Sequence, residues 1–163
     1  MIIREVAKED AARICEIYAP HITHSAVSFE LEVPSIEAMQ ERIAAYTAAY
    51  PWFVAIVDDN IVGYAYASSY RERKAYQFCV ETSVYIDESA QKKGIASALY
   101  QRLFEELKRR GFAQAFAVST QPNEKSEAFH KSQGFESFAV FEKVGYKFNQ
   151  WHDVLWMRRK IQN

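Results

Sequence analysis

The segment Val84-Tyr85-Ile86-Asp87-Glu88-Ser89-Ala90-Gln91-Lys92-Lys93-Gly94-Ile95-Ala96-Ser97 is the most informative part of the chain. It predicts a strand that ends at Ile86, a polar loop, and a helix that begins at Gly94. Backbone N–H groups without an intrahelical partner gather at such a helix start, together with the positive end of the helix dipole. This arrangement binds phosphate, and glycine lets a diphosphate come close to the backbone. The segment has neither the Gly-Lys-Ser/Thr of a P-loop nor three spaced glycines, so an ordinary loop remains an alternative.

The segments on both sides of this loop predict alternating strands and helices. Leucine and isoleucine at four-residue spacing after Gly94 predict an amphipathic helix that ends at Gly111. Ser35 is expected to cap a helix with a capping-box type of start, and Asp58-Asp59-Asn60 to form a hairpin turn. The expected strands are 2–6, 52–57, 61–68, 76–86, 112–118 and two strands within 135–160 around Gly145; the expected helices are 8–18, 35–50, 95–111 and 122–134. This order predicts one α/β or α+β domain over residues 1–163, with a largely antiparallel sheet covered by helices.

Composition excludes several classes of function. The 163 residues are 49% hydrophobic and 25% charged with a net charge of -1, so no overall charge attracts nucleic acid or an anionic membrane. The N-terminus has no signal-peptide core, and no apolar run approaches the roughly 20 residues of a spanning helix, which predicts a cytoplasmic protein. The two cysteines and four histidines show no metal-ligand spacing, so no metal is expected.

Several motifs together resemble one protein family. Gln91, Gly94 and Ala96 match the Q/R-x-x-G-x-G/A signature of the GNAT acetyltransferase superfamily. Further segments resemble its phosphinothricin and methionine sulfone (or sulfoximine) acetyltransferase branch, in the same order along nearly the whole chain. They are Tyr50-Pro51-Trp52, Val80 to Ile86, Gln121-Pro122-Asn123, His130 before Gly134-Phe135, and Val144 to Lys147 with Trp151 to Val154.

The resemblance implies a fold and a co-substrate. The implied fold is a mixed, mostly antiparallel sheet of about seven strands flanked by about four helices, with a V-shaped split between the fourth and fifth strands. Acetyl-CoA would lie in the split, and no metal is implied. Its pantetheine arm would pair with Val84, Tyr85 and Ile86, and its diphosphate would bind the loop. The implied cofactor-binding residues of the loop and the following helix are Gln91, Lys92, Lys93, Gly94, Ile95, Ala96, Ser97, Asn123 and Ser126.

Two residues are candidates for proton transfer. An amine attacks a thioester only when it is neutral, so a nearby base helps the reaction. Glu81 is the candidate base, on the strand face opposite to the apolar side chains of Val80 and Val84. An ion pair with Arg71 or Arg73, or simple solvent exposure, is the alternative. His130 stands where most of the superfamily has a tyrosine and could donate a proton to the leaving CoA thiolate, or could be a packed helix histidine.

The predicted acceptor is the amine of a small amino-acid-like molecule of the phosphinothricin, methionine sulfone or methionine sulfoximine type. Arginine binds carboxylate or phosphinate in a two-point fork. Arg71 matches a substrate-contacting position of the branch, so the resemblance implies that it anchors the substrate's carboxylate; a solvated turn is the alternative. The candidate substrate-binding residues are Arg71, Glu72, Arg73, Glu81, Thr82, Ser83 and Phe29. Another acceptor (a protein N-terminus or a polyamine) and a non-catalytic acyl-CoA-binding protein are the alternatives. The family also implies a homodimer, without nucleic-acid or membrane partners.

Overall fold

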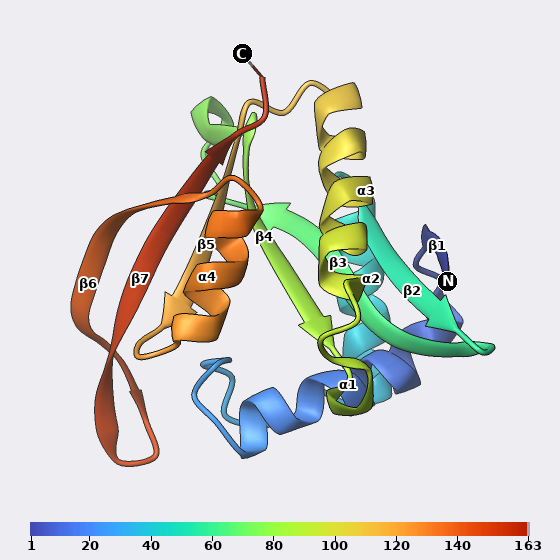
Figure 1. The fold of residues 1–163 in the computed structure, drawn as a ribbon, viewed down its shortest axis with the longest axis horizontal. Coiled ribbons are helices and arrows are strands. Elements are labelled where there is room, and N and C mark those ends of the chain that lie inside the picture. The colour runs from blue at the N-terminus through green and yellow to red at the C-terminus, as the bar shows by residue number, and fades with distance from the viewer. Residues whose placement is uncertain (163) are drawn as a thin grey trace.

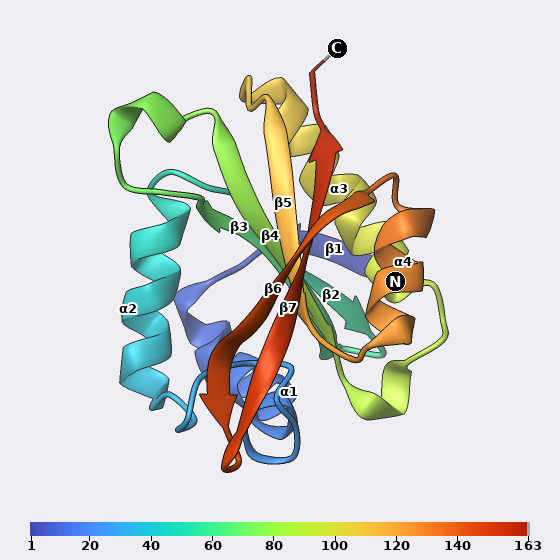
Figure 2. The same ribbon diagram turned by 90° about the vertical axis from the view of Figure 1, so that its left-hand side faces the viewer.

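The computed structural model describes residues 1–162 and contains one seven-stranded sheet with helices on both faces (Figures 1 and 2). The strand order is β1-β2-β3-β4-β5-β7-β6, and every neighbouring pair is antiparallel except β4 and β5, which are parallel. The strands are β1 (Ile2–Glu5), β2 (Trp52–Val57), β3 (Asn60–Ser69), β4 (Cys79–Ile86), β5 (Gln114–Thr120), β6 (Glu136–Lys147) and β7 (Gln150–Lys160). The expected mixed, mostly antiparallel sheet is thereby confirmed.

In the part of the chain that the structure describes, four α-helices cover the sheet, two on each face. They are α1 (Ala11–Thr23), α2 (Ile36–Thr47), α3 (Ile95–Arg109) and α4 (Glu124–Ser132). Figure 2 shows α2 on one side of the sheet and α3 and α4 on the other. Each face has its own core: α3 buries Leu99, Leu103 and Leu107 against β2, β3 and β4, whereas α1 and α2 pack around Trp52 and Tyr64. The leucine spacing that predicted α3 is the spacing of its buried face.

The sheet splits between β4 and β5. These two strands pair over three positions only, Cys79 with Gln114, Val80 with Ala115 and Glu81 with Phe116. Beyond Glu81 they diverge, as Figure 1 shows, with α4 near the widening gap. From Thr82 to Ile86, β4 is paired with β3 alone. The predicted V-shaped opening between the fourth and fifth strands is therefore present, and Glu81 lies at its narrow end.

The structure corrects two expectations about local structure. The hairpin of the C-terminal strands turns at Phe148 and Asn149, which have φ of 54° and 58°, and not at Gly145. Gly145 lies inside β6, where Phe29 packs directly over its Cα and leaves no room for a side chain. Ser35 caps α2 by accepting a hydrogen bond from the Ala38 amide at 3.0 Å, but the capping-box partner is missing because its position holds alanine.

Within residues 1–162, none of the helices has both the length and the apolar character required to span a bilayer.

Candidate active site

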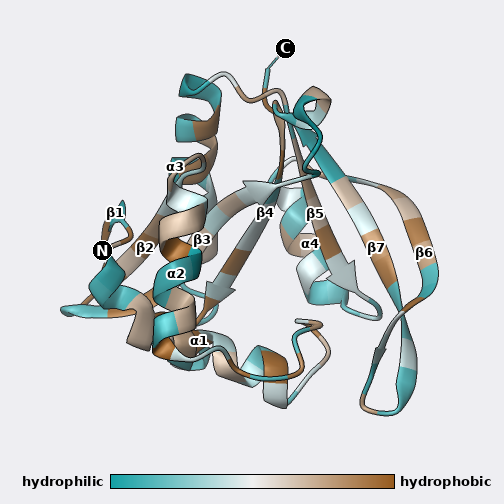
Figure 3. Cartoon of the chain, turned by 180° about the vertical axis from the view of Figure 1, so that it is seen from behind, coloured by the Kyte–Doolittle hydropathy of each residue, from teal (hydrophilic) through white to brown (hydrophobic). Residues whose placement is uncertain are grey.

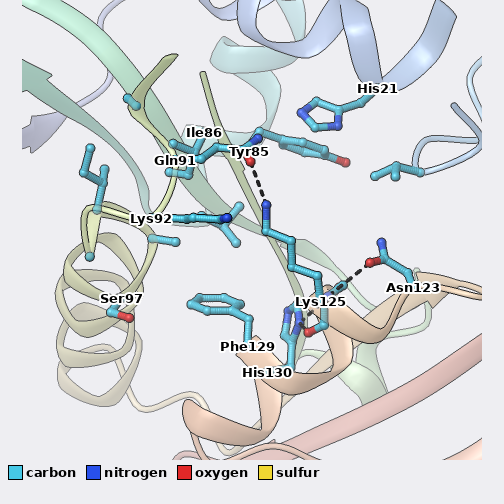
Figure 4. Close-up of a pocket in the computed structure, with 17 residues that line it drawn as sticks. His21, Tyr85, Ile86, Gln91, Lys92, Ser97, Asn123, Lys125, Phe129 and His130 are labelled. Atoms are coloured by element: carbon cyan, nitrogen blue, oxygen red, sulfur yellow. Dashed lines mark hydrogen bonds between the residues drawn. The ribbon is translucent and has the colours of Figure 1, made fainter. Parts of the chain in front are cut away.

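The N-terminus of α3 opens onto the main cavity, which has a volume of about 470 Å³ (Figure 4). Gly94 caps the helix in the left-handed conformation with φ of 74°, which glycine adopts without strain. The first turn of α3 directs its free N–H groups toward this cavity, so the site favours an anionic group. Its lining includes every predicted cofactor residue except Lys93: Val84, Tyr85, Ile86, Gln91, Lys92, Gly94, Ile95, Ala96, Ser97, Asn123 and Ser126.

Lys93 points elsewhere and donates to the backbone oxygen of Ser89 at 3.3 Å. Lys125 was not among the predicted cofactor residues, yet its side chain crosses the main cavity. From α4 it reaches the loop before α3, where its Nζ donates to Oε1 of Gln91 at 2.6 Å (Figure 4). Two lysines, Lys92 and Lys125, therefore line the cavity near the helix start. A surface lysine on a short helix has no sequence pattern that distinguishes it from a solvated one.

A smaller junction cavity of about 120 Å³ continues from the main cavity into the split of the sheet. It shares Val84, Asn123, Ser126 and His130 with the main cavity. It also shares Glu81, Val118 and Thr120 with a second cavity of about 470 Å³ on the far side. The three cavities therefore form one path through the sheet, and Glu81 and His130 both line its narrow part.

Glu81 is half-buried at the point where β4 and β5 separate. Within residues 1–162 its carboxylate has no ion pair or side-chain hydrogen bond, so the alternative of an ion pair with Arg71 or Arg73 is not realised. Burial raises the pKa of Glu81 above its ordinary value, because the charged form loses water that no partner replaces. A carboxylate with a raised pKa is a stronger proton acceptor than one in water.

The imidazole of His130 is buried between α3 and α4, and both ring nitrogens have partners. Nδ1 lies 2.8 Å from the backbone oxygen of Ser126, and Nε2 lies 3.2 Å from the hydroxyl of Tyr100. Burial lowers the pKa of His130, while the hydrogen bond to Ser126 opposes that effect. The ring is therefore biased toward its neutral form. It is packed in the way expected of a structural helix histidine, although its edge lines the junction cavity.

The second cavity is mainly apolar. Phe29, on the loop between α1 and α2, covers one side and is held close to β6 at Gly145. Lys147, which is 4% exposed, fixes this loop by donating from Nζ to the Ser28 backbone oxygen at 2.7 Å. The remaining lining residues are Val27, Ser28, Glu81, Tyr85, Val118, Thr120, Phe141, Val144, Val154 and Trp156.

The other predicted substrate residues divide into two groups. Thr82 and Ser83 line the junction cavity beside Glu81. Arg71, Glu72 and Arg73 are exposed and line none of these three cavities. The Arg71 guanidinium lies 5.4 Å from the ring centre of Tyr70, which stacks on Phe116 and meets Trp156 edge-on. Arg71 thus sits on an aromatic cluster that ends at a wall of the second cavity.

No group of three or more His, Cys, Asp or Glu side chains that could hold a metal ion occurs within residues 1–162.

Comparison with known proteins places this architecture in a family. The acetyltransferase (GNAT) domain family matches residues 3–156. The chain is 33% identical to the phosphinothricin N-acetyltransferase of Streptomyces viridochromogenes over 96% of its own length and 86% of the relative's. It is 32% identical to the L-methionine sulfoximine/L-methionine sulfone acetyltransferase of Salmonella typhimurium, covering 99% of this chain and 95% of the relative.

A solved structure has the same fold. The crystal structure of a GNAT superfamily phosphinothricin acetyltransferase from Sinorhizobium meliloti, in complex with AcCoA, superposes with a TM-score of 0.93 at 34% identity. The match covers 98% of this chain and 87% of that one. The chain therefore belongs to the GNAT acetyltransferase family, and the protein is an acetyltransferase.

Proposed function

We propose that the protein transfers the acetyl group of acetyl-CoA to the amine of a small amino-acid-like substrate, with residues 1–163 acting as one domain. The observation that carries the proposal is the path of three adjoining cavities that share lining residues, with an anion-binding helix start at one end and, at its narrow part, a carboxylate that has no ion pair within residues 1–162. The main cavity suits the diphosphate and pantetheine of acetyl-CoA, and the open edge of β4 offers its backbone to the pantetheine amides. The relatives' acetyl acceptors support the substrate class.

Glu81 is the proposed general base. Amines with a pKa between about 8 and 10 are mostly protonated at pH 7, and the neutral form costs roughly 1.4 to 4 kcal/mol. The neutral amine nitrogen attacks the acetyl carbon, the C–N bond forms, the C–S bond breaks, and CoA leaves as the thiolate. The proton that the amine loses goes to Glu81 directly or through one water. His130 lines the thioester end, but donation to sulfur would require its ring to exchange an existing hydrogen bond.

Replacing the carboxylate by its neutral isostere tests the base. We expect Glu81→Gln to lower the rate of CoA release by about 100- to 10,000-fold at neutral pH. Acetyl-CoA binding, measured by calorimetry, should stay nearly unchanged. Glu127→Gln on α4 is the matched control and should keep full activity, because Glu127 contacts Lys131 on the helix surface. A variant at Glu81 that keeps its rate at every pH would remove this residue from the mechanism.

The pH dependence has a defined direction. Glu81 accepts a proton only when ionised, so activity should fall as the pH falls through its pKa, which burial places above the ordinary glutamate value. The Glu81→Gln variant should lose this acid limb. Its residual rate should follow only the ionisation of the substrate amine, rising with pH.

Arg71 is the proposed carboxylate anchor. It has no carboxylate partner within residues 1–162. The Tyr70 cluster on which it lies reaches Trp156, in a wall of the second cavity, which is the proposed acceptor cavity. Arg71→Lys keeps the charge but loses the two-point fork. It should therefore raise KM for an amino acid and leave KM for the corresponding decarboxylated amine unchanged. Equal effects on both acceptors would favour a polyamine or another amine without a carboxylate, and activity on peptides alone would favour a protein N-terminus.

We also propose a homodimer and a cytoplasmic location. β6 is an edge strand that carries apolar segments (Figure 3). Its exposed large apolar side chains include Phe138, Val140 and Tyr146, and Trp151 of β7 is exposed as well. Such an edge invites pairing with a second copy. Light scattering after size exclusion tests the dimer, and Val140→Lys should dissociate it.

The free thiols of Cys15 and Cys79 suit a reducing compartment, which supports the cytoplasmic location.

A further inference from the structure

A chain of hydrogen bonds runs behind the junction cavity and connects its two walls. The hydroxyl of Tyr100, on α3, lies 3.2 Å from Oγ1 of Thr82 on β4 and 3.2 Å from Nε2 of His130 on α4. Thr82 and His130 both line the junction cavity, whereas Tyr100 is fully buried behind them. One hydroxyl therefore joins the three elements that form the site: the strand of Glu81, the anion-binding helix and the helix of His130.

The partners fix the positions of the protons. The backbone oxygen of Ser126 can only accept, so Nδ1 of His130 carries a hydrogen and donates it. In the neutral ring Nε2 is then an acceptor, and Tyr100 donates to it. Since the tyrosine proton points to His130, Thr82 donates its own proton to the tyrosine oxygen. The hydrogen bonds all run in one direction, from Thr82 to His130 to Ser126.

The surroundings make this arrangement costly to break. The ring of Tyr100 packs against Phe104, Phe129 and Phe135, and the latter two also contact the imidazole of His130. These phenylalanine side chains have no polar atom that could replace a lost hydrogen bond. If a buried imidazole nitrogen or hydroxyl is left without a partner, the folded state is destabilised by the full desolvation cost of that group.

Ionisable groups near the imidazole come from several elements. Glu81 of β4 shares the junction cavity with His130, and Lys125 of its own helix shares the main cavity. Arg159 of β7 acts on Tyr100, the direct partner of the ring. Within residues 1–162, Tyr100 is the residue that is hydrogen-bonded to Nε2, so it has the most direct effect on which ring nitrogen carries the proton.

We propose that Tyr100 is a positioning residue of the active site, which holds His130 neutral with its proton on Nδ1 and ties the His130 wall of the junction cavity to the Thr82 wall. The proposal deepens the acetyltransferase function proposed above and rests on it. Its consequence is that His130 keeps both nitrogens occupied and shapes the thioester end of the path without donating a proton to the sulfur. Glu81 is then the side chain of the junction cavity that takes up the proton of the reaction.

Nitrogen NMR of histidine-labelled protein tests the proposal directly. In the unsubstituted protein we expect the His130 signals of a neutral ring protonated on Nδ1, assigned by their loss in His130→Asn. Tyr100→Phe keeps the ring packing and removes the hydroxyl, which takes away both the donor to Nε2 and the acceptor for Thr82. We expect it to shift the Nε2 signal and raise the pH at which His130 takes up a proton. The rate of CoA release should fall by about three- to tenfold, the effect of one neutral hydrogen bond.

Thr82→Val is the matched control, because it removes the other hydrogen bond of Tyr100 without touching the imidazole. It should leave the His130 signals close to their original positions. A His130 protonated on Nε2 in the unsubstituted protein would overturn the proposal even if Tyr100→Phe fails to fold. So would unchanged His130 signals in a folded Tyr100→Phe protein. A protein that releases no CoA with any amine, but shows the expected His130 signals, would instead contradict the proposed function.

Discussion

Gly145→Ala is expected to damage the acceptor cavity and leave the acetyl-CoA side intact. A Cβ at position 145 would lie 2.2 Å from Cζ of Phe29, whereas ordinary contact begins at 3.4 Å, so the ring has to move by at least 1.2 Å (3.4 − 2.2). Phe29 is 39% exposed and can swing outward, which opens one wall of the cavity. Overpacking of this kind costs about 1–3 kcal/mol. If acceptor binding bears about 1.4 kcal/mol of that cost, KM for the acceptor rises about tenfold.

Steady-state kinetics with each substrate varied in turn measures this effect. KM for acetyl-CoA should stay the same, because Gly145 and Phe29 lie outside the main cavity. The double variant Gly145→Ala with Phe29→Ala supplies the control, since removing the ring removes the clash. It should be no worse than Phe29→Ala alone, because the two changes act on one contact. Additive losses, or an equal rise in both KM values, would refute the reasoning.

Substitutions at Gly94, Lys147 and Glu106 probe other parts of the structure. Gly94→Ala forces a non-glycine residue to φ of 74° with no side-chain clash, so it should raise KM for acetyl-CoA and lower Tm by a few degrees, measured by kinetics and thermal unfolding. Lys147→Met removes the donor to Ser28 and should raise KM for the acceptor but not for acetyl-CoA; unchanged acceptor kinetics would contradict the role of Lys147. Arg109 and Arg110 lower the pKa of Glu106 to about 2, so its contribution to stability is present above about pH 4.5 and lost as the pH falls toward 2. Glu106→Gln should remove that part of the acid dependence of Tm.

The sequence predicted the elements whose side-chain periods are regular. The four-residue spacing of Leu99, Leu103 and Leu107 follows the buried face of α3, and the alternation along β4 separates Val80 from Glu81. The helix start at Gly94 could be predicted because a helix needs a cap and glycine supplies a left-handed one. These are local effects, and they are encoded by neighbouring residues.

Features that depend on distant contacts were not predictable in the same way. Gly145 resembled a turn residue, and only the ring of Phe29 from a remote loop explains a glycine within a strand. Asn149 was the residue that could have indicated the true position of the turn, since asparagine tolerates positive φ. Tyr100 fits the apolar face of α3, so nothing local distinguishes it from core until His130 and Thr82 are placed beside its hydroxyl.

The short pairing between β4 and β5 limits the backbone pairing between the two portions of the sheet. One portion of the sheet, β1 to β4, meets the other, β5 to β7, through three residue pairs. An extended ligand that binds along Thr82 to Ile86 would add contacts between the two portions of the sheet and so stabilise them against each other. Amide hydrogen exchange in β4 and β5 should therefore slow together when such a ligand binds, and the melting temperature should rise with its concentration.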